Sequence, residues 1–483
     1  MKYSFRELLN LLGICLRGKQ AKPAAPPALV EQKSTEFEAY AASVRADYEE
    51  ALKMLVEIPS VSVDPERKAD IQRTADAAVA LLRSIGASAE AVKTSGNPVV
   101  FGEILTDPKN QTVLLYNHLD VQPADPSEWS SDPFKMTNEN GVYRGRGTTD
   151  DKGPAMAALF GAKYAVDHKL PVNIKFIWEL EEEIGGPSFD EFINANKARL
   201  KTDSIVIADT IWVSRDRPAI PYGLRGLQGM LLRLTTAAKD VHSGTTGGVA
   251  RNPIAELADV ISHCVDAKTG RVLIPGFYDD VRELSEQELA NFLKSGFDIN
   301  NFMRAHELKS VRTTDSKDAA RRIWALPTFE VHGITGGYSG PGIKTIVPHT
   351  AEAKISMRLV PDQNPGRAAE LLTNFVKSIN PDVEVVKLDG LRPYLGEYGG
   401  PYYQAASKAM ARAFGREAAY TREGGSIGAA LSMNETLKAP VVFLGLSLPE
   451  HGYHAVNENF DWQQAGGGIQ MFCHYFKLLG EMK

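Results

Sequence analysis

The sequence has few cysteines, no long apolar run and no excess of basic residues. Its 483 residues include three cysteines, Cys15, Cys264 and Cys473. An odd number of widely spaced cysteines gives neither a disulfide framework nor a Cys-x-x-Cys metal site, so a reducing, cytoplasmic location is expected. The 54 Lys+Arg and 60 Asp+Glu residues give a net charge of −6, which does not indicate nucleic-acid binding.

The apolar stretch Leu8–Leu16 is the one candidate for a targeting signal. It is far too short to span a bilayer, and no small-residue cleavage site follows it closely. We therefore expect residues 1–33 to form an extension and linker, with export through this extension as the alternative. No membrane span is predicted elsewhere.

The length predicts two to three domains, at about 150 residues per domain. Over residues 34–223, buried strands such as Thr112–Asn117 and Val172–Glu179 alternate with helical patterns such as Pro154–His168. This alternation predicts an α/β fold with a mostly parallel sheet and helices on both faces. From residue 224 to 396 the strands have partly polar faces, which indicates a smaller inserted α+β domain. The chain then returns to the first domain over residues 397–483.

Histidine and carboxylate side chains stand where predicted strands end or a helix begins. Each has an ordinary explanation alone: a surface histidine, a helix N-cap or a solvated acidic run. Together these residues indicate a binding site, because ligands of open α/β sheets bind at the carboxyl ends of the strands. Two histidines and several carboxylates there are what a two-metal hydrolytic site requires. The residues are His118, Asp120, Asp150, Asp151, Glu181, Glu182, Glu183, Asp209 and His454.

Two other enzyme or binding classes have weaker patterns. Ser426 lies in a G-x-S-x-G pattern at Gly424–Gly428, with His451 and His454 downstream, as in a serine hydrolase. That pattern is short and leaves the acidic clusters unexplained. The segment Gly337–Thr345 is close to a P-loop, but one residue separates its glycine from its lysine, so we reject nucleotide binding.

Eleven segments from about residue 36 to the C-terminus follow the order of a known family. On these residues the chain resembles the carnosinase-like (cytosolic non-specific dipeptidase-like) members of the dinuclear metallopeptidase family that includes acetylornithine deacetylase, succinyl-diaminopimelate desuccinylase and aminoacylase. The segments are Asn117–Pro123, Trp129 with Asp132–Phe134, Tyr143–Pro154, Glu179–Gly186, Ile207–Thr210, Tyr222–Gly226, Asp240–Gly248, Gly342–Pro348, Met357–Pro361, Arg422–Ile427 and His454–Glu458.

The resemblance implies a di-zinc exopeptidase-like fold and two divalent metal ions, with Zn²⁺ favoured and Mn²⁺ or Co²⁺ as alternatives. It implies that Asp120 fixes a ligand histidine and that Glu182 is the general base acting on a metal-bridging water. Each ion would have three protein ligands because one aspartate bridges both. The implied ligands are His118 and Asp209 for one ion, Glu183 and His454 for the other, and Asp150 as the bridge.

The resemblance also implies a small peptide substrate and a homodimer formed through the inserted domain. His242, in this chain or in the partner subunit, would stabilise the oxyanion, and Thr345, Arg358 and Ser426 would bind the substrate. Deacylation of N-acyl amino acids is the alternative activity, and a relative that has lost catalysis and serves as a binding protein is the non-enzymatic one.

Three departures from the family pattern touch no implied ligand. They are Asn117, Leu180 and Ile184, which replace the more usual Gly, Gly and Ser. We expect them to affect the shape of the pocket and the preferred side chain rather than the chemistry.

Overall fold

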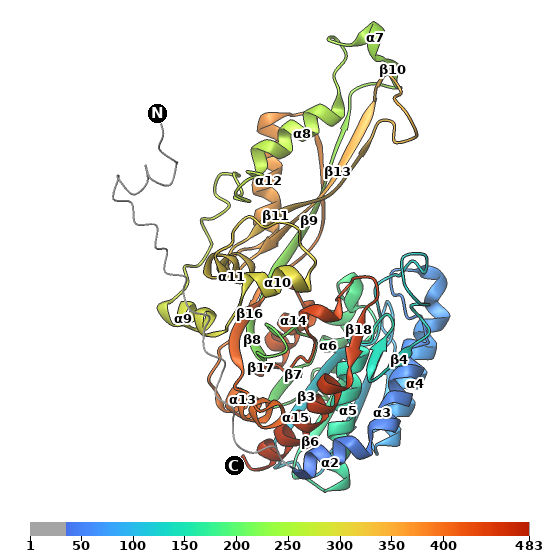
Figure 1. Ribbon diagram of the computed structural model, residues 1–483, viewed down its shortest axis with the longest axis vertical. Coiled ribbons are helices and arrows are strands. Elements are labelled where there is room, and N and C mark those ends of the chain that lie inside the picture. The colour runs from blue at the N-terminus through green and yellow to red at the C-terminus, as the bar shows by residue number, and fades with distance from the viewer. Residues whose placement is uncertain (1–34, 483) are drawn as a thin grey trace, which may run out of the picture.

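The computed structural model describes residues 35–482. The predicted extension over residues 1–33, including Leu8–Leu16 and Cys15, lies outside the described residues. Figure 1 shows an elongated molecule, in which a broad lower part holds both the first and the last described elements and a narrower upper part extends from it. Within residues 35–482, no helix has both the length and the apolarity needed to cross a membrane.

A six-stranded mixed sheet forms the centre of the lower part. Its strand order is β1-β2-β6-β3-β7-β17. Strands β6, β3, β7 and β17 are mutually parallel, as the sequence predicts, whereas β1 and β2 add an antiparallel edge. The strands are β1 (Ser88–Val92), β2 (Val99–Ile104), β3 (Thr112–His118), β6 (Asn173–Glu179), β7 (Ser204–Ile207) and β17 (Val441–Phe443).

Helices bury both faces of this sheet. In β3, Val113 and Leu115 join the core on one face, and Leu114 and Tyr116 join the core on the other. Because helices cover both faces of the sheet, side chains that alternate between the faces are all buried, which explains why β3 is an unbroken apolar run. Helices α2–α5, α13 and α15 contribute to the first core, and α6 and α14 to the second. Their bounds are α2 (Thr35–Ser43), α3 (Arg45–Val56), α4 (Lys68–Ser84), α5 (Lys152–Asp167), α6 (Phe189–Asn196), α13 (Pro401–Phe414), α14 (Gly428–Leu437) and α15 (Trp462–Gly480).

Two small three-stranded sheets join segments that are distant in the sequence. One has the order β15-β8-β16 and the other β18-β5-β4. In the second, Asn459 pairs with Arg144, which places the chain after residue 450 beside the chain before residue 150. The strands are β4 (Thr137–Glu139), β5 (Val142–Arg144), β8 (Ala219–Leu224), β15 (Tyr394–Leu395), β16 (Ala419–Glu423) and β18 (Asn459–Asp461).

The upper part is an antiparallel sheet of four strands, which we call the lid sheet. Its order is β11-β13-β9-β14, and α8 and α12 cover it around a separate core that includes Leu232, Ile355 and Leu372. At its far end, β10, α7 and β12 form the lid tip (Figure 1). The bounds are β9 (Gly226–Thr235), β10 (Val241–His242), α7 (Ser243–Thr246), α8 (Pro253–Cys264), β11 (Thr328–Gly336), β12 (Ile346–Val347), β13 (Thr350–Leu359), α12 (Pro365–Ile379) and β14 (Glu384–Leu391).

Part of the segment between β10 and β11 packs on the lower part of the molecule. Phe292 of α9 and Trp324 of α11 lie edge to face, 5.0 Å apart between ring centroids, and both belong to the core of the six-stranded sheet. Glu288 also pairs with Arg422 of β16. The segment 224–396 is therefore not one packing unit. The helices are α9 (Glu286–Lys294), α10 (Ile299–Ala305) and α11 (Ser316–Ala325).

Candidate metal centre

The carboxyl ends of three parallel strands bring the first acidic and histidine residues together. His118 is the last residue of β3 and pairs in register with Glu179, the last residue of β6. Asp209 follows the end of β7, and Asp150 precedes α5. His118, Asp150 and Asp209 are all buried. The predicted strand-end cluster is therefore formed by the fold.

His118 faces two carboxylates through Nε2. This nitrogen lies 3.0 Å from Asp150 Oδ1 and 3.8 Å from Asp209 Oδ2. The other ring nitrogen, Nδ1, lies 3.1 Å from the main-chain oxygen of Asp120 and 3.5 Å from its carboxylate Oδ1. A carbonyl oxygen can only accept, so Nδ1 carries the proton. Nε2 is therefore the ring nitrogen that could bind a metal ion between the carboxylates.

His454 completes a second group around the same aspartate. Its Nε2 lies 3.0 Å from Asp150 Oδ2 and 3.1 Å from Glu183 Oε2. Ligand atoms of His118, Asp150 and Asp209 lie within 4.8 Å of one another, and so do those of Asp150, Glu183 and His454. Asp150 belongs to both groups, with one oxygen toward each histidine.

The charges of the cluster favour a bound cation. Burial by itself lowers the pKa of His118, but hydrogen bonds to Asp120 and Asp150 raise it well above its ordinary value. Burial raises the pKa of Asp209 to about 6, and His118 opposes this shift. Buried carboxylates are stabilised by a proton or a metal ion. Nitrogen and oxygen donors in this number fit divalent metal ions.

Asp120 links the end of β3 to the two glutamates of the short 3₁₀ turn η2 (Glu182–Ile184). Its carboxylate accepts the backbone N–H of Glu182 at 3.2 Å and that of Glu183 at 3.0 Å. Gln122 Nε2 donates to Glu183 Oε2 at 2.8 Å. Burial raises the pKa of Glu182 well above its ordinary value; His118 opposes this, and Asp209 and Glu183 add to it.

Three residues that contact the cluster were not predicted to act there. Tyr453 donates its hydroxyl to Asp209 Oδ1 at 3.0 Å, and Asn117 donates Nδ2 to Asp151 Oδ2 at 2.7 Å. Glu458 accepts the backbone N–H of Asp150 at 3.1 Å. Tyr453 and Asn117 are each next to a predicted ligand, and Glu458 closes the motif that begins at His454. Their positions in the sequence were the only signal.

A pair of arginines lies where the base of the lid sheet meets the lower part. Arg358 Nη1 donates to Ser426 Oγ at 3.0 Å, and Arg225 Nε donates to the main-chain oxygen of Gly424 at 2.9 Å. Burial lowers the pKa of Arg358. Burial and, after it, the charge of Arg358 lower the pKa of Arg225 to about 10. Two neighbouring guanidinium groups favour an anionic ligand.

The contact between Arg358 and Ser426 bears on the serine-hydrolase alternative. Among residues 35–482, no histidine is hydrogen-bonded to Ser426. His451 instead lies 3.1 Å from Thr149 Oγ1 through Nδ1 and 3.2 Å from Asp461 Oδ2 through Nε2. His454 faces Asp150 and Glu183. In this described part of the chain, Ser426 therefore has no histidine placed to act as its general base.

His242 and Thr345 lie at the lid tip, and a single chain does not bring them to the metal cluster (Figure 1). The Ser243 N–H donates to the main-chain oxygen of Thr345 at 3.0 Å. The ten residues of β13, which ends beside Arg358, separate the tip from the base by about 30 Å.

The imidazole of His242 is fixed by its own turn. Nδ1 accepts the N–H of Gly244 at 2.9 Å, so the neutral ring carries its proton on Nε2. A Cβ at Gly244 would lie 2.7 Å from His242 Cε1, so this approach requires glycine. His242 is exposed and offers an N–H donor at the tip.

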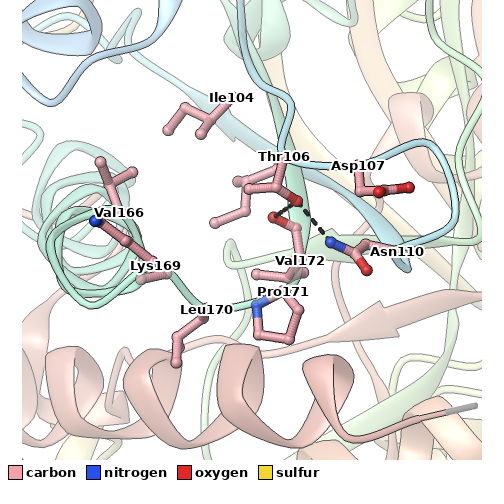
Figure 2. Close-up of a pocket in the computed structure, with 11 residues that line it drawn as sticks. Ile104, Thr106, Asp107, Asn110, Val166, Lys169, Leu170, Pro171 and Val172 are labelled. Carbon is pink, nitrogen blue, oxygen red and sulfur yellow. Dashed lines mark hydrogen bonds between the residues drawn. The ribbon is translucent and has the colours of Figure 1, made fainter.

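A cavity of about 300 Å³ lies away from this cluster. Its lining residues, drawn in Figure 2, include Asn110 and Val172, which lie beside the starts of β3 and β6. The candidate ligands lie at the other ends of these strands. Its lining contains no histidine and a single carboxylate, so it does not share the chemistry of the cluster. The lining residues are Ile104, Thr106, Asp107, Asn110, Ala165, Val166, Lys169, Leu170, Pro171, Val172 and Ile174.

The fold and the cluster define a class of protein, a metallohydrolase with a mixed α/β sheet whose candidate metal ligands lie at the strand ends. The chain belongs to peptidase family M20/M25/M40, whose sequence pattern matches residues 114–478. The predicted family, fold class and metallopeptidase activity are confirmed.

Three comparisons, one of sequence and two of structure, show how far the likeness extends. The human Beta-Ala-His dipeptidase is 32% identical over 499 residues, which covers 98% of this chain and 97% of that protein. The structure of the di-peptidase Dug1p from Saccharomyces cerevisiae has a TM-score of 0.85 and 29% identity, covering 93% of this chain and 98% of that one. Human carnosine dipeptidase 1 has a TM-score of 0.83 and 30% identity, covering 92% and 99%.

Proposed function

We propose that this chain hydrolyses the peptide bond of dipeptides or short peptides with two divalent metal ions. The observation that carries the proposal is the pair of ligand groups that share Asp150, each with one histidine and a further carboxylate. Relatives aligned along almost the whole chain are named as dipeptidases, which supports a small peptide as the substrate.

The ligands follow from the two groups. His118, Asp150 and Asp209 would hold one ion, and Asp150, Glu183 and His454 would hold the other. Imidazole and carboxylate donors favour Zn²⁺, and the number of oxygen donors also suits Mn²⁺ or Co²⁺. When bound, two such ions acidify a water molecule and polarise the scissile carbonyl.

Glu182 would act as the general base. Its backbone N–H is fixed by Asp120, and its neighbour Glu183 belongs to the second ligand group. Its carboxylate would take a proton from the attacking water and deliver it to the leaving amine nitrogen. Burial favours the protonated form of Glu182, and cations held by the surrounding carboxylates would favour the ionised form.

Substrate binding would involve the base and the tip of two different lids. Arg358, in contact with Ser426, would bind the carboxylate of the dipeptide. Because His242 and Thr345 lie about 30 Å from the base of their own lid, we infer a homodimer through the inserted domain. The tip of one subunit would then reach the site of the other. There His242 Nε2–H would donate to the oxyanion.

The cysteines support a reducing compartment for this activity. Cys264 and Cys473 are both buried and unpaired. Burial raises the pKa of the Cys264 thiol to about 12, so this thiol stays protonated and unreactive. A cytoplasmic location fits this state.

The test is hydrolysis by the purified protein before and after chelation, with Zn²⁺ or Mn²⁺ restored. The substrates are a panel of dipeptides and a panel of N-acetylated amino acids. We expect hydrolysis of dipeptides that is lost on chelation and recovered with metal. Activity confined to the N-acetylated substrates would favour the deacylase alternative, and activity that chelators do not affect would contradict the proposal.

A further inference from the structure

Glu458 is a buried carboxylate placed between the two loops that carry the candidate ligands Asp150 and His454. Its side chain is fully buried, and it lies four residues after His454. A buried charge is costly unless donors surround it. The donors that surround Glu458 all come from the loop before α5.

Both carboxylate oxygens of Glu458 are used. Oε1 accepts the N–H of Thr149 at 2.9 Å and that of Asp150 at 3.1 Å. Oε2 accepts the N–H of Gly147 at 2.9 Å and Nη1 of Arg146 at 2.8 Å. Four donors from consecutive or near-consecutive residues thus converge on one side chain, so Glu458 sets the main-chain path that leads into Asp150.

The same residue also anchors the loop that carries His454. The side chain of His454 is 56% exposed, so packing contributes little to its position. The backbone oxygen of Glu458 accepts the N–H of Gly145 at 3.1 Å, and the next residue, Asn459, pairs with Arg144. The loop is therefore held on both sides of His454: His451, three residues before it, lies 3.1 Å from Thr149, and Glu458, four residues after it, accepts the N–H groups of Thr149 and Asp150.

A second set of contacts extends from Glu458 to an otherwise unexplained motif. The guanidinium of Arg146 lies over the ring of Trp129, 5.2 Å from its centroid. Asn457 Oδ1 accepts the N–H and the hydroxyl of Ser130 at 2.8 and 2.7 Å. The segment that contains Trp129 therefore supports both Arg146 and the His454 loop.

We propose that Glu458 is a positioning residue for the metal centre. It holds Asp150 and His454 at the separation that they need to bind the same metal ion. This inference rests on the proposed function, since it assumes that both residues bind metal. Outer partners of metal ligands typically change metal affinity about 10–100-fold when they are altered.

The test variant is E458Q, because an amide cannot replace this carboxylate. Whichever way the amide turns, its NH₂ group faces two donors, either those of Thr149 and Asp150 or those of Gly147 and Arg146. E458D keeps both acceptor oxygens on a shorter side chain. E450Q is the matched control: Glu450 lies on the same loop, is 43% exposed and pairs with Arg215.

The readout is Zn²⁺ affinity, measured by competition with a chromophoric chelator, together with a thermal melt of each metal-free protein. We expect E450Q to bind Zn²⁺ like the wild type, E458Q to bind it about 10–100-fold more weakly, and E458D to lie between. Wild-type affinity in E458Q would overturn the proposal, even with a lower melting temperature, because the role would then be structural only.

If E458Q does not fold, E458D carries the test, and an affinity equal to that of the wild type overturns the proposal. A wild-type protein that binds Zn²⁺ but hydrolyses no dipeptide would contradict the proposed function and leave this inference standing. The two failures are therefore distinguishable.

Discussion

The carboxylate of Asp120 accepts the backbone N–H of Glu182 at 3.2 Å. The residue just beyond β3 thus holds the turn after β6, where the proposed base and a proposed ligand lie side by side. Its own main-chain oxygen contacts Nδ1 of His118 at 3.1 Å. Asp120 therefore positions both the first histidine and the glutamate pair, which is more than the single histidine contact that the family pattern implies.

We predict that Asp120→Asn lowers kcat for dipeptide hydrolysis about 10–100-fold. The amide can accept only one of the two N–H groups of Glu182 and Glu183, and its NH₂ group repels the other. The measurement is steady-state kinetics with metal content by elemental analysis. D125N is the matched control, because Asp125 is an exposed aspartate on the following loop. A kcat for D120N equal to that of D125N would contradict this role of Asp120.

His242 offers a test of whether one subunit completes the site of another. We predict that His242→Ala lowers kcat and leaves the metal content unchanged, because His242 belongs to neither ligand group. Mixing H242A with E182Q subunits should restore activity, since half of the random dimers would have one site with an intact base and an intact tip. The expected recovery is about a quarter of the wild-type activity in a C₂ dimer.

The control for this mixture is each variant assayed alone under the same dissociation and reassembly conditions. No recovery, with dimers shown to form by size-exclusion chromatography, would place His242 outside the partner's site. Recovery can be measured only if each variant is defective alone, so the two single-variant assays come first.

Arg358 should determine affinity for the carboxylate of the substrate. We predict that Arg358→Lys raises KM for dipeptides about 10–100-fold, because a bidentate charged contact contributes about 1.5–3 kcal/mol and lysine cannot reproduce its geometry. The same variant should hydrolyse the corresponding dipeptide amides as the wild type does, since these lack the carboxylate. An equal loss on both substrates would assign Arg358 to support of the fold or of Ser426 instead.

The sequence predicted the parallel strands well because their burial on both faces makes each a short apolar run. Thr112–Asn117 and Val172–Glu179 match β3 and β6 within a residue. The same reasoning placed His118 and Asp209 at strand ends, where the structure brings them together. Chain order and strand ends were enough for this part of the cluster.

Contacts between residues far apart in the chain could not be predicted in this way. Nothing in the residue pattern shows that Glu458 accepts the N–H of Thr149 or that Tyr453 bonds to Asp209. The antiparallel edge strand β1 was not predicted either, because it pairs on one side only and has a partly exposed pattern. The distance of His242 from the metal cluster could not be predicted from the sequence, because it depends on the length of the lid sheet.

A last prediction concerns stability rather than catalysis. Burial lowers the pKa of His474 on α15 to about 4, and the charges of Arg412 and Lys477 contribute. The folded protein therefore binds this proton less readily than the unfolded chain, whose histidine has an ordinary pKa of about 6.5. The contribution of His474 to the free energy of unfolding is fully present above pH 6.5. It falls by about 1.4 kcal/mol per pH unit between pH 6.5 and 4.

We predict that His474→Phe reduces this acid sensitivity. The ring of His474 lies edge to face with Phe37, 4.5 Å between centroids, and phenylalanine can keep this packing without a titratable nitrogen. The measurement is the free energy of unfolding in urea at pH 7.5 and pH 5. The difference between the two pH values should be smaller in H474F than in the wild type. At pH 7.5 the imidazole is neutral in both states, so this value serves as the control for packing. Metal ligands titrate equally in both proteins, and an unchanged pH dependence would therefore show that His474 takes up its proton in the folded state.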